Sequence, residues 1–149
     1  MTRFQLVVSL AGRILQSGQM YLNSALREKQ LGSAEANILM FLYTHGDGVR
    51  QEDIVAGVDV SKPAVSRTIM SLVKKGYVKR VHNQDDKRSY TILLTEKARK
   101  EEAFIQKHYE DLVVAASSGI PEAKIEEFVE IFRRVADNLD AYRKSKFGR

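Results

Sequence analysis

The sequence predicts a mainly α-helical protein with one small β-hairpin, in which a winged helix-turn-helix lobe is joined to long helices from both termini. Apolar residues recur at three- and four-residue steps over most of the chain, and the period changes to two only in 78–94. Two short helices separated by a tight turn come directly before that change. We expect a long helix in 1–32, the lobe in 33–94 and two long helices in 95–149.

Glycine, proline and hydroxyl residues set the expected helix ends in the first half of the chain. A first helix is expected over 4–28, and Ser33 is the expected N-cap of a second helix to about residue 45. A short third helix covers 51–57, followed by a tight turn over 59–61. The fourth helix, 61–75, begins at Ser61 as N-cap, with a proline in its first turn, where the missing N–H breaks no intrahelical bond.

The second half begins with the hairpin. Two strands, 78–81 and 89–94, enclose a polar loop and form a two-stranded ribbon. A fifth helix is expected from Thr95 to about residue 117. A sixth runs from Pro121 to about residue 142, and the tail beyond it is expected to fray.

Positive charge is concentrated in the middle of the chain. The net charge is +5, but 61–100 alone holds eleven Lys and Arg against three Asp and Glu, while the segments on either side are slightly acidic. Scattered basic residues usually only solubilise a surface. A concentration over the fourth helix and the hairpin favours a polyanion as partner.

Composition excludes several other classes. The chain has no cysteine, which excludes disulfides, a thiolate nucleophile and thiolate-ligated metal. No apolar run approaches the roughly 18 residues of a membrane span and no leader is visible, so we expect a cytoplasmic protein without a membrane partner. His45, His82 and His108 lie on three different elements without metal-ligand spacing. We therefore expect no catalytic residues, no metal and no cofactor.

The fourth helix has the pattern of a DNA recognition helix. Val65, Ile69 and Leu72 fall on one face and should pack inward. Arg67, on the opposite face, can make two parallel hydrogen bonds to guanine O6 and N7 in double-stranded DNA. A capped helix with a polar outer face is common, so this signal alone is weak. The expected DNA contacts of this helix are Lys62, Pro63, Ser66, Arg67, Met70 and Lys74.

The hairpin adds basic residues beside that helix. We expect DNA contacts from Arg80, Lys87 and Arg88 of this hairpin, which is the wing of the lobe. Arg88, near the tip of the wing, is expected to enter the minor groove, where the negative potential is highest. Asp86 and Ser89 are expected to shape the loop. A local ion pair between Asp86 and the Arg88 side chain is an open alternative.

Several short motifs together resemble the MarR family of transcriptional regulators. They are Val65-Ser66-Arg67, the run 72–78 with Arg80 two residues on, the wing sequence Asp86-Lys87-Arg88-Ser89, and Leu94-Thr95-Glu96-Lys97. The resemblance covers nearly the whole chain and is strongest over 51–99. Ala98 departs from the glycine that many members have there.

The resemblance implies a homodimer that reads a palindromic operator and acts as a repressor. The first, fifth and sixth helices would form the dimer interface; a helical bundle within one chain is the alternative. Members often bind small aromatic acids between the lobe and the dimer helices, and Phe4, Tyr21, Phe41 and Tyr43 could line such a pocket here or simply be core. Two other functions stay open: an architectural DNA-binding protein without strong sequence preference, and a module that binds only proteins.

Overall fold

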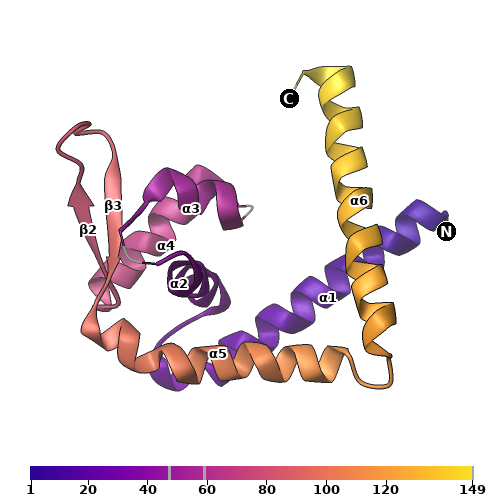
Figure 1. Cartoon of the computed structure of the whole chain (residues 1–149), viewed down its shortest axis with the longest axis horizontal. Helices are drawn as coiled ribbons and strands as arrows, with labels where there is room; N and C mark the ends of the chain where they lie inside the picture. Colours follow the sequence, from indigo (N-terminus) through magenta and orange to yellow (C-terminus); the bar gives the residue numbers. More distant parts are fainter. Residues whose placement is uncertain (47, 59, 149) are drawn as a thin grey trace. The chain divides into compact units, whose positions relative to one another are not determined.

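The computed structural model describes residues 1–46, 48–58 and 60–148 (Figure 1). Asp59, the first residue of the predicted turn 59–61, lies outside the described residues. In chain order the elements are α1 (Arg3–Ala25), the 3₁₀ turn η1 (Arg27–Lys29), α2 (Ser33–His45), β1 (Val49–Arg50), α3 (Gln51–Val58), α4 (Lys62–Lys74), β2 (Val78–His82), β3 (Tyr90–Leu94), α5 (Glu96–Ala116) and α6 (Glu122–Phe147).

The chain forms two compact units, Met1–Glu110 and Asp111–Arg149. In the first, α2 packs against α3 and α4, and α4 packs against β2, so that helices and sheet enclose one core (Figure 1). That core contains fully buried side chains from α2, α3, α4 and β3, among them Leu39, Ile54, Ile69 and Ile92. The second unit holds the end of α5 and all of α6. The three-part division at 32 and 94 concerns function and stays a prediction.

The sheet has three antiparallel strands in the order β1-β3-β2. Strands β2 and β3 form the expected hairpin, with Val78 opposite Leu94 and His82 opposite Tyr90. The predicted fold class is confirmed, but the two-stranded ribbon was incomplete, because β1 pairs with β3 through Val49 opposite Ile92. A strand of two residues is too short to show a period of two, which is why the sequence did not indicate it.

Three helix ends differ from the expectation. The first helix, expected to about residue 28, ends at Ala25 and is followed by the 3₁₀ turn η1. Ser33 is the first residue of α2 and Gly32 is its N-cap, so the predicted Ser33 cap was wrong. The Gly32 N–H instead donates to the Glu35 carboxylate at 2.9 Å, which the sequence pattern did not reveal. The predicted fraying from residue 143 is also wrong, because α6 continues to Phe147. Lys144 and Lys146 lie in its last turn, where positive charge interacts favourably with the negative end of the helix dipole.

A partly buried ion pair ties the end of α4 to the start of α2. Glu35 is 8% exposed, and its carboxylate accepts from the Lys75 ammonium at 2.8 Å and from the Ser71 hydroxyl at 2.8 Å. The same ammonium donates to the carbonyl of Gln30 at 2.6 Å. Since hydrogen bonds to a buried charge must be complete for the charge to be tolerated, this cluster fixes the end of α4 against the α1–α2 connection.

None of the described helices is both long and apolar enough to cross a membrane.

Candidate nucleic-acid interface

Helix α4 presents a polar face to solvent because its apolar face is fully used in the core. Val65, Ile69 and Leu72 are completely buried. The Ser61 hydroxyl accepts from the Ala64 N–H at 3.3 Å and caps the helix, as expected. Of the predicted contact residues, Ser66 is partly buried, and the others on this helix are exposed: Lys62, Pro63, Arg67, Met70 and Lys74. The helix therefore displays three cations and no carboxylate on its outer face.

Arg80 is held between the sheet and α4. Its guanidinium carbon lies 3.4 Å from the centroid of the Tyr90 ring, a stacked cation–π contact. Its Nε donates to Gln51 Oε1 at 3.2 Å, and Nη1 lies 3.6 Å from the Met70 sulfur. Side chains from β3, α3 and α4 thus fix one cation beside the exposed face of α4.

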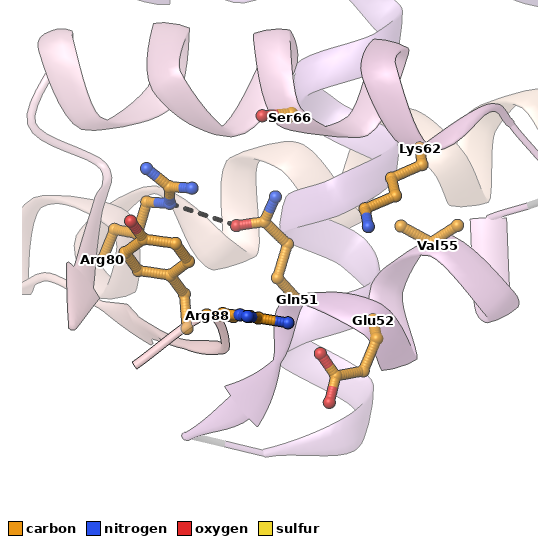
Figure 2. A pocket seen from close by; sticks show the side chains of 8 residues that line it. Gln51, Glu52, Val55, Lys62, Ser66, Arg80 and Arg88 are labelled. Carbon is orange, nitrogen blue, oxygen red and sulfur yellow. Dashed lines mark hydrogen bonds between the residues drawn. The ribbon is translucent and has the colours of Figure 1, made fainter. Parts of the chain in front are cut away.

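A cavity of about 250 Å³ opens between α3, α4 and the hairpin (Figure 2). Lys62 and Ser66 reach it from α4, Arg80 from β2, and Arg88 from the loop 83–89 between β2 and β3, here called the wing loop. The complete lining is Gln51, Glu52, Val55, Lys62, Ser66, Arg80, Arg88 and Tyr90. Three cations face a single carboxylate there, so the cavity favours an anionic group such as a backbone phosphate.

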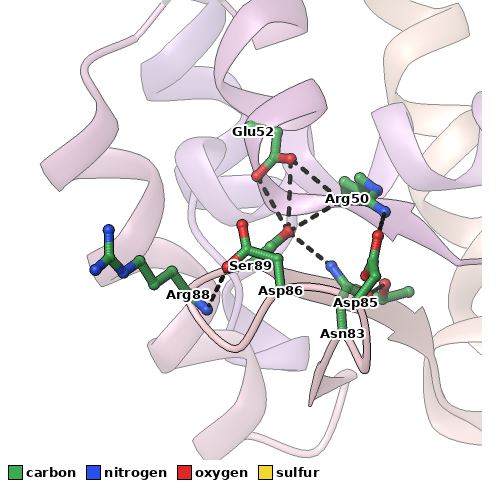
Figure 3. Close-up of polar contacts among 8 residues, drawn as sticks. Arg50, Glu52, Asn83, Asp85, Asp86, Arg88 and Ser89 are labelled. Carbon is green, nitrogen blue, oxygen red and sulfur yellow. Dashed lines mark hydrogen bonds and ion pairs between the residues drawn. The ribbon is translucent and has the colours of Figure 1, made fainter.

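The wing loop keeps its shape through short-range hydrogen bonds. The Arg88 backbone N–H donates to Asp86 Oδ1 at 3.0 Å, and His82 Nδ1 lies 2.9 Å from the carbonyl of Lys87. The contact between Asp86 and Arg88 is thus made by the backbone, whereas the Arg88 side chain extends away toward the cavity (Figures 2 and 3). Lys87 is exposed.

A polar cluster at the base of the wing was missed from the sequence (Figure 3). Arg50 pairs with Asp85 at 2.9 Å, and the Arg50 guanidinium holds the pKa of that carboxyl below its usual range. Ser89, 5% exposed, stands at the centre of the cluster and accepts from Asn83 Nδ2 at 2.7 Å. Nothing in the sequence pairs Arg50 with Asp85, 35 residues away, because neither motif nor period connects them.

The aromatic residues proposed for a ligand pocket do not gather in one place. Tyr21 Oη lies 3.0 Å from His108 Nδ1, while Tyr43 donates to the carbonyl of Ala98 at 2.6 Å. Burial, followed by the nearby Glu102 carboxylate, raises the pKa of the Tyr43 phenol above its ordinary value. Phe41 stacks on His45 and lines a shallow groove between α2 and α3. Phe4 is exposed.

Within 1–46, 48–58 and 60–148, no group of three or more His, Asp or Glu side chains could hold a metal ion.

The fold and this face define the chain as a winged helix-turn-helix protein, with a recognition helix and a basic wing around one cationic cavity. Residues 29–89 match the model of the MarR family. The chain is similar to a MarR transcriptional regulator from Methanosarcina mazei Go1, with 27% identity, a TM-score of 0.81, and coverage of 90% of this chain and 96% of that one. The chain thus has the fold and the lobe sequence of the MarR family of transcriptional regulators, and the resemblance seen in the sequence is confirmed.

Two further comparisons extend this result. The uncharacterized HTH-type transcriptional regulator YfiV of Bacillus subtilis strain 168 is 35% identical over 66 residues, which are 44% of this chain. The uncharacterized HTH-type transcriptional regulator YdgJ of the same strain is 23% identical over 110 residues. The matched segments span 41% of the length of YfiV and 66% of the length of YdgJ. CouR from Rhodococcus jostii RHA1, solved bound to p-coumaroyl-CoA, shares the fold with a TM-score of 0.75 at 18% identity, covering 87% of this chain and 91% of that one.

Proposed function

We propose that this chain is a sequence-specific, double-stranded DNA-binding transcriptional regulator. One observation carries the proposal: Lys62, Arg80 and Arg88 converge on a single cavity beside the exposed face of α4. Because a duplex presents phosphates on both sides of its major groove, a helix in the groove and cations at its edge engage the same DNA together.

The two parts of this face have different tasks in the proposal. Arg67 on α4 reads a base edge, since the residue is exposed and a guanidinium matches guanine O6 and N7. Arg88 and Lys87 on the wing contact the backbone and the minor groove, whose potential depends on its width. Lys62 and Arg80 bind phosphates, and Lys74 adds positive charge further along the helix.

The functional form we propose is a homodimer on a palindromic operator. Helix α1 exposes Leu10, Ile14 and Leu15, and α6 exposes Phe128, Phe132 and Leu139. Apolar faces of this length are costly in water, and a second copy of the same chain would cover them. Two lobes related by a two-fold axis would then read two half-sites about one helical turn apart, roughly 34–36 Å.

We propose repression as the mode of regulation, because a dimer that occupies its operator excludes other proteins from the same DNA. Release by a small aromatic effector completes the proposal. Its support is the shared fold with CouR and the groove at Phe41, where an aromatic ring already stacks on His45. The probe for this part is benzoate, whose addition should release bound DNA from the unmodified protein and much less from Phe41→Ala.

The decisive experiment selects bound sequences from a random duplex pool with the purified protein. A palindromic consensus supports the regulator. Binding without enrichment of any sequence would favour the architectural protein, and absence of DNA binding would leave the protein-interaction module. Affinity for the selected site should fall with salt at a log–log slope near −0.9 for each phosphate contacted. A flat salt response would contradict the role given to the cationic cavity.

A further inference from the structure

Three consecutive residues at the β1–α3 junction each reach a different part of the wing. Arg50 Nη2 donates to Asp85 Oδ2 in the loop at 2.9 Å. Gln51 Oε1 accepts from Arg80 Nε on β2 at 3.2 Å. Glu52 accepts from the Ser89 hydroxyl, just before β3, at 3.4 Å. The junction that starts the helix-turn-helix is therefore also the support of the hairpin.

Ser89 links these contacts inside the cluster (Figure 3). Its buried hydroxyl accepts from Asn83 Nδ2 at 2.7 Å and from Arg50 Nη1 at 3.4 Å, while Asn83 in turn accepts from the Thr91 hydroxyl. Arg50 therefore contacts the wing loop at two points, Ser89 and Asp85. A loop held at two points by one guanidinium has less freedom to swing than one held by its strands alone.

Arg88 depends on this support because it lies between the two anchored points and Ser89 is its direct neighbour. The loop closes around it through the Asn83 N–H to the Ser89 carbonyl and the Ser89 N–H to the Asp86 carbonyl, each 3.0 Å. Its side chain then extends into the cavity that Lys62 and Ser66 of α4 also line (Figure 2). The distance between Arg88 and the recognition helix is thus set by how the loop is attached to β1.

We propose that Arg50 and Asp85 form a clasp that positions Arg88 relative to α4, and that this Arg50–Asp85 clasp is required for full DNA affinity. The inference rests on the proposed function. Both are positioning residues: they act through Arg88, and neither needs to touch DNA itself.

The direction in which Asp85→Asn changes the DNA affinity distinguishes a positioning contact from a surface charge without a role. Asp85 is a carboxylate on a face that binds a polyanion, with its side chain 67% exposed. If it were a bystander, removing its charge would strengthen DNA binding, because repulsion of phosphates would disappear. If it is part of the clasp, Asp85→Asn weakens binding although the protein becomes more positive.

The experiment measures affinity for the selected site by fluorescence anisotropy with the full chain. Asp85→Asn should bind about tenfold more weakly, the scale of one well-placed protein–DNA contact. Arg50→Lys, which keeps the net charge but offers one nitrogen where Arg50 uses two, should also lose affinity. The matched control is Asp53→Asn, the same charge change on the exposed side of α3, which should bind as well as the unmodified protein or slightly better.

A second background tests whether the clasp acts through Arg88. In Arg88→Ala, adding Asp85→Asn should change the DNA affinity by less than about twofold. If Asp85 acts through Arg88, its substitution has little left to affect once Arg88 is removed, and the two effects are not additive. The proposal is overturned if Asp85→Asn binds as tightly as Asp53→Asn, or if its loss persists in full without Arg88. If the unmodified, folded protein binds no DNA in the selection, the proposed function itself fails, which is a different result.

Discussion

The ring of Phe41 on α2 occupies the space in which a side chain of residue 57 on α3 would stand. A Cβ atom at Gly57 would lie 2.1 Å from Cε2 of Phe41 and 2.9 Å from Cδ2, far inside van der Waals contact. The absence of a side chain at this position therefore allows α2 and α3 to approach each other, with the Phe41–His45 stack on one side of the contact.

Gly57→Ala should destabilise the protein by about 1–3 kcal/mol, the usual cost of overpacking. In an unhindered helix the same change would stabilise by about 1 kcal/mol. A loss of stability therefore indicates that the added methyl group collides with the Phe41 ring. Chemical denaturation measures it. In a Phe41→Leu background the penalty should shrink, because the ring is gone; an equal penalty in both backgrounds would show that the ring is not its cause.

Glu35→Gln should lower the free energy of unfolding by about 1–3 kcal/mol, since the Glu35 carboxylate is mostly buried and its charge pairs with the partly exposed Lys75 ammonium and accepts from Ser71. The matched control is Glu127→Gln, which breaks an exposed pair with Lys124 on α6 and should cost no more than about 0.5 kcal/mol. Similar costs for the two would mean that the buried cluster does not hold α4 in place.

Arg67→Ala and Arg88→Ala should differ in kind. Arg67→Ala should weaken binding to the selected site by about 1–3 kcal/mol, and weaken binding to random DNA much less, since it removes a base contact. Arg88→Ala should weaken both, with the larger loss at sites flanked by A·T-rich sequence. Thermal melts verify folding. If Arg67→Ala leaves the ratio of specific to random binding unchanged, α4 does not read bases. The result would then favour an architectural DNA-binding protein without strong sequence preference.

Light scattering at micromolar concentration should give about twice the chain mass of 16.9 kDa. A double change, Phe128→Glu with Phe132→Glu, should yield monomers, because it places charges on the exposed apolar face of α6. Val81→Glu, on an exposed apolar residue of the wing, is the control and should stay dimeric. A monomer in the unmodified protein would contradict the dimer proposal.

Tyr43 should make the fold sensitive to alkaline pH. Its pKa is raised by burial, so the unfolded chain ionises near pH 10 while the folded one keeps the proton donated to Ala98. The contribution is complete below about pH 10 and is lost as pH rises through the folded-state pKa. Tyr43→Phe should cost about 1 kcal/mol at neutral pH and reduce the decline of thermal stability above pH 10. If thermal stability declined above pH 10 as steeply in Tyr43→Phe as in the unmodified protein, groups other than Tyr43 would be its cause.

What could be read from the sequence is what local rules decide. The buried face of α4, its Ser61 cap and the β2–β3 hairpin follow from side-chain period and backbone preference within a few residues, so they were predicted correctly. The concentration of charge in 61–100 was likewise visible, because it needs only the order of residues.

Only the tertiary structure decided which of these residues meet. Arg50 with Asp85, Gln51 with Arg80, and Phe41 with Gly57 are joined by the packing of α2, α3 and the sheet, and no period or motif links the partners. The third strand is a product of the same packing: Val49 and Arg50 pair with β3 because α2 and α3 bring them there. Local sequence thus determined the elements and the sign of the surface, whereas the position of the wing arises from contacts between segments that are neighbours only in space.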